Sequence, residues 1–214
     1  ELQPYDRIPS ENDFSKQFEI SPMTARKALN GLANDGYVYR QRGLGTYVAP
    51  KHMTHTLDKL VGFSEDLHAH GLSPSSKIIC YEIQPATQTV AQALKIKTGR
   101  KVLRIKRLRF ADQDPVAVHD AYLAADTPIT RRELEELGSL YALLESKNFK
   151  IYSGVDEIIS IPADQEMSLQ LGVKIGAPLL QLTRLTEDES GNPIELVIAV
   201  YKADFYRYTI RLRR

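Results

Sequence analysis

The sequence is poor in the residues that build disulfide frameworks, zinc sites and membrane spans. Its 214 residues include one cysteine, Cys80, and no tryptophan. A single cysteine excludes an internal disulfide and a zinc site built on cysteines. No apolar run approaches the roughly 20 residues of a membrane-spanning helix, and no signal-peptide hydrophobic region opens the chain. We therefore expect a cytoplasmic protein.

The sequence also has almost no net charge. It holds 28 basic and 27 acidic residues, a formal charge of +1, which taken alone argues against a strongly basic nucleic-acid-binding protein. The charge is unevenly distributed, because residues 20–51 carry five lysines and arginines against one acidic residue. The 21 basic and 21 acidic residues of 52–214 cancel. A short basic segment inside a neutral chain is more informative than the sum.

The first fifty residues carry the start signals of two short helices. Ser10 followed by Asp13 three residues later has the pattern of a capping box, which predicts a helix that reaches about Phe18. Ser21 before Pro22 predicts the start of a second helix, with serine as the N-cap and proline at the first helical position.

A basic hairpin is predicted to follow the second helix. That helix is expected to end at Gly36, and segments 37–40 and 46–48 read as strands joined by a glycine-bearing turn. This pattern is typical of a winged helix-turn-helix, whose second helix enters the major groove of DNA with its N-terminal end. A small helical subdomain with a solvated charged face is the alternative. The polar residues expected near DNA are Ser21, Thr24, Arg26, Lys27, Arg40 and Arg42.

The same stretch resembles the GntR family of bacterial transcription regulators. The matching motifs are Ile8–Glu11, Ser21–Leu29, Gly36–Val38 and Arg42–Val48. By this resemblance, the positions that commonly contact operator DNA are Ser21, Thr24, Arg26 and Gly43. Asn12 and Pro22 stand where the family usually or often has arginine, so the operator preference or the affinity is expected to differ. The family has a further helix before Ile8, which we expect to be absent from this chain.

The pattern of polar and apolar residues changes after residue 56. Residues 50–56 are polar and lack periodicity, which predicts a linker between a first domain, 1–49, and a second domain, 57–214. Two adjacent hairpins in the second domain favour a mainly antiparallel sheet. The predicted strands are 76–84, 100–110, 115–122, 150–161, 178–188, 193–201 and 206–213, and the predicted helices are 62–70, 87–95, 130–137, 139–147 and 163–171.

Three of these strands place polar residues on otherwise apolar faces. Because side chains alternate between the two faces of a strand, Arg107 and Arg109 continue an apolar face, and Glu195 and His119 lie on the apolar faces of two other strands. Charges on a core-side face are costly unless they are paired or used by a ligand. Two interpretations stay open here: a ligand site, or pairing of either arginine with Glu195 or Glu157 across the sheet.

Two predicted helix starts add hydroxyl groups. Ser139 is expected to cap a helix that has Tyr141 in its first turn, and Ser64 lies at the start of another. Helix N-termini with hydroxyl groups suit anions. Together with the arginines, these groups predict a cradle for a phosphate or a carboxylate.

Residues 57–214 resemble the UTRA effector-binding domain of the HutC subfamily within the GntR family. The motifs lie in 107–118, 139–145 and 193–208. The resemblance implies an α+β fold like that of chorismate lyase, around a six-stranded antiparallel sheet. It also implies that the phosphate of an amino-sugar phosphate would be held by Ser64, Arg107, Arg109 and Ser139, and the sugar by Tyr141, Glu195 and Tyr201. His119 stands where a glutamate is common, which leaves the sugar itself open.

Other reactive residues are expected to be structural. The pairs His52/His55 and His68/His70 have no further ligands nearby in the sequence and are predicted to be solvated, with no metal bound. Cys80 is expected to be an inert thiol in the core. The paired tyrosines of 206–208 are expected to serve core packing or a dimer contact.

These observations predict an effector-controlled transcription regulator, a repressor, which acts as a homodimer on palindromic operator DNA. The effector is expected to be a small anion, most of all a phosphorylated sugar such as an amino-sugar 6-phosphate. A carboxylate or phosphonate metabolite is the alternative. We expect no enzyme activity and no cofactor. A chorismate-lyase-like enzyme and a constitutive DNA-binding architectural protein are the rivals from other classes, and the sequence contains no recognisable nucleophile–base set for the former.

Overall fold

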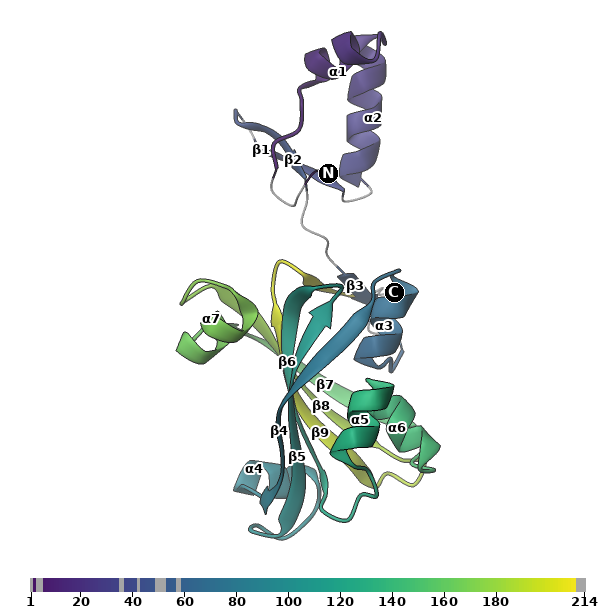
Figure 1. The fold of residues 1–214 in the computed structure, drawn as a ribbon, viewed down its shortest axis with the longest axis vertical. Coiled ribbons are helices and arrows are strands. Elements are labelled where there is room, and N and C mark those ends of the chain that lie inside the picture. The colour runs from purple at the N-terminus through teal and green to yellow at the C-terminus, as the bar shows by residue number, and fades with distance from the viewer. Residues whose placement is uncertain are drawn as a thin grey trace, which may run out of the picture. The chain divides into compact units, whose positions relative to one another are not determined.

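The computed structural model describes residues 2, 6–34, 37–41, 43–48, 53–56 and 59–210. The chain divides into two compact units, Glu1–His52 and Met53–Arg214 (Figure 1). No helix in these described ranges has the length and hydrophobicity that crossing a bilayer requires.

The first unit contains two helices and a hairpin, as predicted. Its elements are α1 (Glu11–Gln17), α2 (Pro22–Asn34), β1 (Val38–Gln41) and β2 (Gly45–Val48). Ser10 caps α1, and the reciprocal bonds with Asp13 complete the predicted capping box. At the start of α2 the Ser21 hydroxyl accepts the N–H of Thr24 at 3.1 Å, which confirms the second predicted helix start. The small core of this unit comprises Ile8, Leu29 and Val38, with Phe14, Ala33 and Val48 packed against them.

The second unit is built on a six-stranded antiparallel sheet in the order β4-β5-β6-β9-β8-β7. The α+β prediction is therefore confirmed. The strands are β4 (Pro74–Pro85), β5 (Lys101–Ala111), β6 (Asp114–Ala124), β7 (Ser153–Pro162), β8 (Pro178–Glu187) and β9 (Pro193–Lys202). The helices are α3 (Phe63–Ala69), α4 (Gln88–Ala93), α5 (Arg131–Leu137), α6 (Leu140–Ser146) and α7 (Gln165–Leu171).

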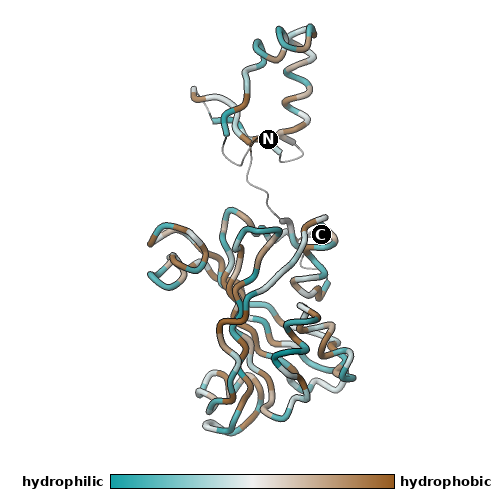
Figure 2. Tube along the Cα trace, in the orientation of Figure 1, coloured by the Kyte–Doolittle hydropathy of each residue, from teal (hydrophilic) through white to brown (hydrophobic). Residues whose placement is uncertain are grey.

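Helices cover the two faces of the sheet unequally. On one face α3, α5 and α6 pack over the central strands and form the main core (Figure 1). On the other face α4 and α7 each cover one end of the sheet and form smaller apolar clusters. Hydrophobic residues follow the strands through the middle of this unit (Figure 2). The face below α3 and α6 holds the buried polar residues described below.

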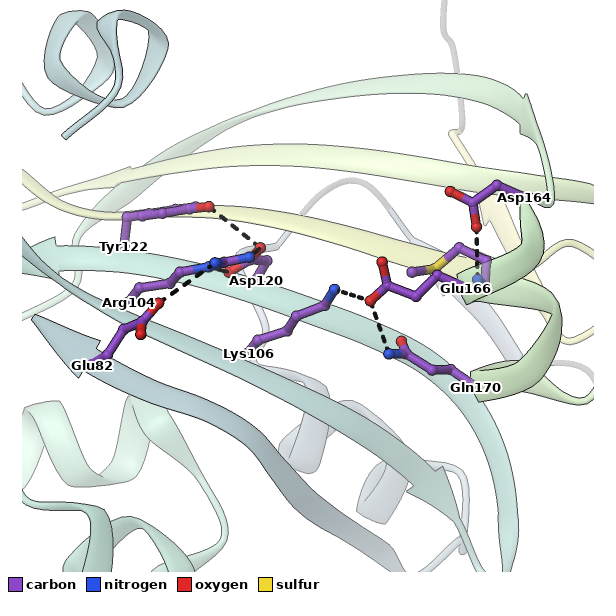
Figure 3. Close-up of polar contacts among 9 residues, drawn as sticks. Glu82, Arg104, Lys106, Asp120, Tyr122, Asp164, Glu166 and Gln170 are labelled. Atoms are coloured by element: carbon purple, nitrogen blue, oxygen red, sulfur yellow. Dashed lines mark hydrogen bonds and ion pairs between the residues drawn. The ribbon is translucent and has the colours of Figure 1, made fainter. Parts of the chain in front are cut away.

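On the opposite face of the sheet, charged side chains form pairs in the region between α4 and α7 (Figure 3). Arg104 donates two hydrogen bonds to the carboxylate of Asp120, at 2.9 and 2.8 Å, and Lys106 pairs with Glu166 on α7 at 2.5 Å. Cys80 lies on this face opposite Lys106 and is half-buried, so the prediction that it lies in the core is wrong. Burial still raises the pKa of its thiol, which disfavours the reactive thiolate.

A further pair of strands lies outside the six-stranded sheet. β3 (Met53–Thr56) pairs in parallel with β10 (Tyr206–Thr209). Part of the predicted linker, 53–56, is therefore a strand, and the prediction is wrong there. The reason is a tertiary contact that local polarity does not reveal, because the side chain of His55 is buried in the second unit. Gly36, Arg42 and His52 lie outside the described residues.

Candidate DNA interface and effector cavity

Helix α2 has one buried side and one exposed polar side. Ala25 and Leu29 are buried against the small core. The four residues predicted to contact DNA on this helix are all exposed at its N-terminal end: Ser21, Thr24, Arg26 and Lys27. Their exposure meets the geometric need of a recognition helix, which presents its first turns to base edges.

The hairpin presents less free charge than the sequence suggests. Gly43 has φ 78°, a left-handed conformation that favours glycine, in the turn between β1 and β2. Arg40 pairs with Glu11 of α1 at 2.8 Å, so its charge is partly compensated within the unit. Arg42, the other predicted contact in this hairpin, lies outside the described residues.

Arg26→Ala is expected to weaken binding to specific DNA by about 1–3 kcal/mol, because an exposed guanidinium on a recognition helix supplies base or phosphate contacts. The measurement is fluorescence anisotropy at fixed salt, with a duplex that the unchanged chain has selected from a random pool. Arg132→Ala is the matched control, since Arg132 is exposed on α5 of the other unit. Equal affinities for Arg26→Ala and the control would contradict the assignment of α2 as a recognition helix.

In the second unit, one cavity is lined by every residue that the sequence predicts for the effector. These are Ser64, Arg107, Arg109, His119, Ser139, Tyr141, Glu195 and Tyr201. They come from α3, β5, β6, the start of α6, and β9. Strand register explains their convergence, because His119 lies opposite Arg107 on one side and Ala199 on the other. The structure thus brings all eight together, while their role stays a prediction.

Two arginine side chains at this cavity are almost completely buried. Arg107 is 4% and Arg109 is 1% exposed. Arg109 donates to the hydroxyl of Ser64 at 3.0 Å and to the carbonyl of Gly138 at 3.4 Å. Its guanidinium also lies 4.3 Å from the ring centre of Phe63. This cation–π contact and the two hydrogen bonds fix the direction of Arg109.

Several polar atoms around the cavity have no hydrogen-bond partner among the described protein groups. They are His55 Nε2, Arg107 Nε and Nη1, Arg109 Nε, His119 Nε2 and Glu195 Oε2. Neither arginine forms an ion pair with a described carboxylate, and Glu157 is exposed. The interpretation that the arginines pair across the sheet with Glu195 or Glu157 is therefore wrong. Unpartnered buried polar groups are costly, and their concentration at one cavity calls for a ligand explanation.

Burial shifts the titration of these groups toward their neutral forms. It lowers the pKa of Arg107 to about 10, although the nearby Glu195 opposes the shift. The pKa of Arg109 is lowered by burial and by the charge of Arg107. Burial raises the pKa of Glu195 to about 7 against the attraction of the arginines. The pKa of His119 falls well below its usual value, first through burial and then through the neighbouring arginines, so this imidazole stays neutral at physiological pH.

The sequence did not identify several residues of the cavity wall. Arg184 of β8 donates to both oxygens of Asp156 at 2.6 and 2.7 Å and to the carbonyl of Val61 at 3.0 Å. Alternation with Leu182 and Thr186 could have placed it on the buried face. The other missed wall residues with a polar or aromatic side chain are His55, Phe63, Tyr206 and Tyr208. Tyr206 belongs to the main core and Tyr208 packs against it, which confirms core packing as one of the two expectations, and both also line the cavity.

The two histidine pairs that the sequence predicts to be solvated differ in their exposure. His68 and His70 are exposed, as predicted, whereas His55 is only 4% exposed and its predicted solvation is wrong. Within the described ranges, no three His, Cys, Asp or Glu side chains are grouped as metal ligands.

The cavity has a volume of about 50 Å³, room for roughly three to five water molecules.

A winged helix-turn-helix joined to an α+β unit with a buried polar cavity defines a class: DNA-binding transcription regulators with a second, sensory domain. Residues 1–48 match the family described as bacterial regulatory proteins, gntR family, and residues 69–207 match the UTRA domain. The chain belongs to the GntR family and carries a UTRA domain, the HutC-type arrangement.

Similar proteins support this assignment along the whole chain. The HTH-type transcriptional repressor NagR of Bacillus subtilis (strain 168) is 32% identical over 209 residues, which cover 97% of this chain and 86% of NagR. The mannosyl-D-glycerate transport/metabolism system repressor MngR of Escherichia coli (strain K12) is 26% identical and covers 100% of this chain and 90% of its own length. The crystal structure of PhnF from Mycobacterium smegmatis superposes with a TM-score of 0.84 at 27% identity, covering 99% of this chain and 94% of PhnF.

Proposed function

We propose that this transcription regulator is a repressor whose operator affinity is lowered by a small anionic effector bound in the cavity of the second unit. The effector class that best fits the wall is a phosphorylated sugar, in particular an amino-sugar 6-phosphate. The proposal includes a homodimer, because two recognition helices on a palindromic operator need two copies of the first unit. It includes no catalytic activity.

The observation that carries the proposal is the group of buried, unpartnered polar atoms around one cavity. Two cations, Arg107 and Arg109, offer unused N–H donors, which suit the oxygens of a phosphate. Glu195 offers an unused acceptor, which suits a hydroxyl or ammonium group of the same molecule. An anion with donor groups at its other end therefore satisfies both sides of the wall. NagR and MngR are both named as repressors, and MngR is named for a mannosyl-D-glycerate transport/metabolism system, which is consistent with this class.

Two observations weigh against the rivals. A constitutive architectural protein has no use for buried cations that lack partners, since apolar residues of similar size would stabilise its second unit better. For a lyase, His119 is not paired with a nucleophile, because its Nε2 has no hydrogen-bond partner among the described residues.

The proposal is tested by titrating the chain with a panel of small anions. Calorimetry is run with glucosamine 6-phosphate, glucose 6-phosphate, inorganic phosphate and simple carboxylates, and each binder is then added to the complex of the chain with its selected duplex. We expect at least one phosphorylated sugar to bind and to weaken DNA binding. The absence of heat with every phosphorylated or carboxylated compound would refute the effector site. Binding that leaves DNA affinity unchanged would refute the control mechanism.

A further inference from the structure

A buried polar cluster next to the cavity joins three segments that are distant in the sequence. His55 of β3 lies 2.8 Å from Asp66 of α3, measured from Nδ1 to Oδ2. Tyr206 of β10 donates its hydroxyl to the same carboxylate oxygen at 2.7 Å. All three side chains are buried. The cluster therefore fixes β3 and β10 against α3, which lies beside β3 in Figure 1.

The protonation of this cluster follows from its hydrogen bonds. Burial alone would raise the pKa of Asp66, but the bonds from His55 and Tyr206 outweigh it and hold the pKa below its usual value. Asp66 is therefore ionised at neutral pH and can only accept. It follows that His55 Nδ1 carries the hydrogen of this bond, and in the neutral imidazole Nε2 is left as an acceptor.

His55 Nε2 is buried, has no partner among the described protein groups, and belongs to the wall of the effector cavity. Helix α3, whose Asp66 bonds His55, also contacts the proposed anion-binding side of that wall. Its residues Ser64 and Phe63 both contact Arg109. One short helix thus contacts both the buried cation and the first strand of the second unit.

β3 is the least anchored part of this wall. It has four residues and pairs with β10 alone among the described strands, outside the six-stranded sheet. Two-stranded pairings are marginally stable by themselves, so β3 depends on the His55–Asp66 bond for its position. Of the elements around the cavity, β3 is therefore the one that an effector in contact with His55 shifts at the lowest cost.

We propose that His55 contacts the effector and couples occupancy of the cavity to β3, the element through which the chain enters the second unit. A hydroxyl or ammonium group of the effector donates to His55 Nε2 while Nδ1 keeps its bond to Asp66. This inference rests on the proposed function and adds a residue that the effector site is not otherwise expected to include. The coupling acts as a difference in effector affinity between two positions of β3.

The test separates effector binding from its effect on DNA. His55→Gln and His55→Phe are compared with the unchanged chain. His70→Gln is the matched control, because His70 is exposed and its Nδ1 lies 2.8 Å from the backbone carbonyl oxygen of Asp66. Glucosamine 6-phosphate is the probe. Its affinity is measured by calorimetry, and the factor by which a saturating concentration weakens binding to the selected duplex is measured by anisotropy.

For the unchanged chain and His70→Gln we expect this coupling factor to lie in the usual range of roughly 5–150. For both His55 variants we expect it to fall below about 3, while the affinity for glucosamine 6-phosphate falls by no more than about tenfold, the effect of one hydrogen bond. A merely structural role of His55 would lower the melting temperature without changing the coupling factor.

The outcomes distinguish this inference from the proposal on which it rests. If glucosamine 6-phosphate binds and releases DNA equally well from the unchanged chain and from both folded His55 variants, only the role of His55 is refuted. If it neither binds nor releases DNA from the unchanged chain, the proposed function fails for this class of effector, and the inference fails with it. His55→Gln keeps a polar side chain of similar reach, so the test stands even where His55→Phe does not fold.

Discussion

Replacing Arg107 with methionine is expected to lower the affinity for the effector strongly. The same substitution is expected to raise the stability of the protein without effector. Arg107 is 4% exposed, and two of its nitrogen atoms have no partner among the described groups. Its burial therefore costs free energy, which the charge of Glu195 offsets only in part, since the pKa of Arg107 stays lowered to about 10. Methionine has a similar length and carries no charge, so it fills the same space without that cost.

The expected magnitudes have opposite signs. Exchanging buried charged groups for apolar ones of similar volume stabilises proteins by about 1–4 kcal/mol, which corresponds to a rise in melting temperature of roughly 2–16 °C for a chain of this size. Losing one buried partner of an anion weakens binding by about 2–4 kcal/mol, or roughly 30- to 1,000-fold. Thermal unfolding in a buffer free of phosphate and sulfate measures the first effect, and calorimetry with glucosamine 6-phosphate measures the second.

Arg132→Met is the control for this substitution. Arg132 is exposed on α5 and pairs with Glu136 on the surface, so its replacement is expected to change neither quantity appreciably. A lower melting temperature for Arg107→Met than for the control would mean that the guanidinium has stabilising partners in the folded protein. That result would remove the main support for an effector site at this cavity.

The effects on stability and on effector affinity have opposite signs because the groups that bind the effector destabilise the folded unit. A site that must bind an anion in a buried cavity has to hold cations there before the anion arrives. The cost of Arg107, Arg109 and the protonated Glu195 is met by the large apolar core formed by the sheet with α3, α5 and α6. The effector then returns part of that cost, so it is expected to raise the melting temperature by an amount that grows with the logarithm of its concentration relative to its Kd.

Much of the cavity could be predicted because its residues lie on long, regular strands. Alternation along β5, β6 and β9 was enough to place Arg107, Arg109, His119 and Glu195 on apolar faces, and the structure confirms these placements. The alternation could not decide between an ion pair across the sheet and a ligand site, because that depends on distances between strands. The helix-start signals added Ser64 and Ser139, and the family resemblance assigned both hydroxyl groups to the phosphate.

The parts that could not be predicted depend on contacts between distant segments. β3 has four residues of mixed polarity, and its partner strand β10 lies about 150 residues further along the chain, so neither local pattern nor a turn signal reveals the pairing. His55 therefore looked like a solvated histidine. Arg184 differs, since it alternates with buried residues on β8 and was overlooked although the same rule identified the arginines of β5.

The remaining prediction concerns the pH dependence of stability, where Glu195 and His119 are expected to act in opposite directions. Glu195 keeps its proton up to about pH 7 in the folded protein, against an ordinary pKa of 4.5. The folded state therefore binds more protons than the unfolded state between these values, and stability is lost as the pH rises from 4.5 to 7. His119 stays neutral in the folded protein well below pH 6.5, so the unfolded state takes up the extra proton, and stability is lost as the pH falls below 6.5.

Glu195→Gln removes the first effect and His119→Gln removes the second. At pH 7.5, Glu195→Gln is expected to be more stable than the unchanged chain by on the order of 3 kcal/mol, because a pKa displaced from 4.5 to about 7 carries that cost, and the gain should vanish near pH 4.5. Between pH 5 and 6.5, stability should rise with pH more steeply in Glu195→Gln than in the unchanged chain, and less steeply in His119→Gln. Urea unfolding at a series of pH values measures these slopes.

Glu157→Gln is the matched control, because Glu157 is an exposed carboxylate on β7 and its replacement should leave the pH profile unchanged. Comparing variants at each pH cancels the contributions of all other titrating groups that lie far from the cavity. A Glu195→Gln profile parallel to that of the unchanged chain would mean that Glu195 is ionised and paired in the folded protein at neutral pH. Arg107 would then have a carboxylate partner, and the cavity would resemble a structural ion pair more than a site prepared for an anion.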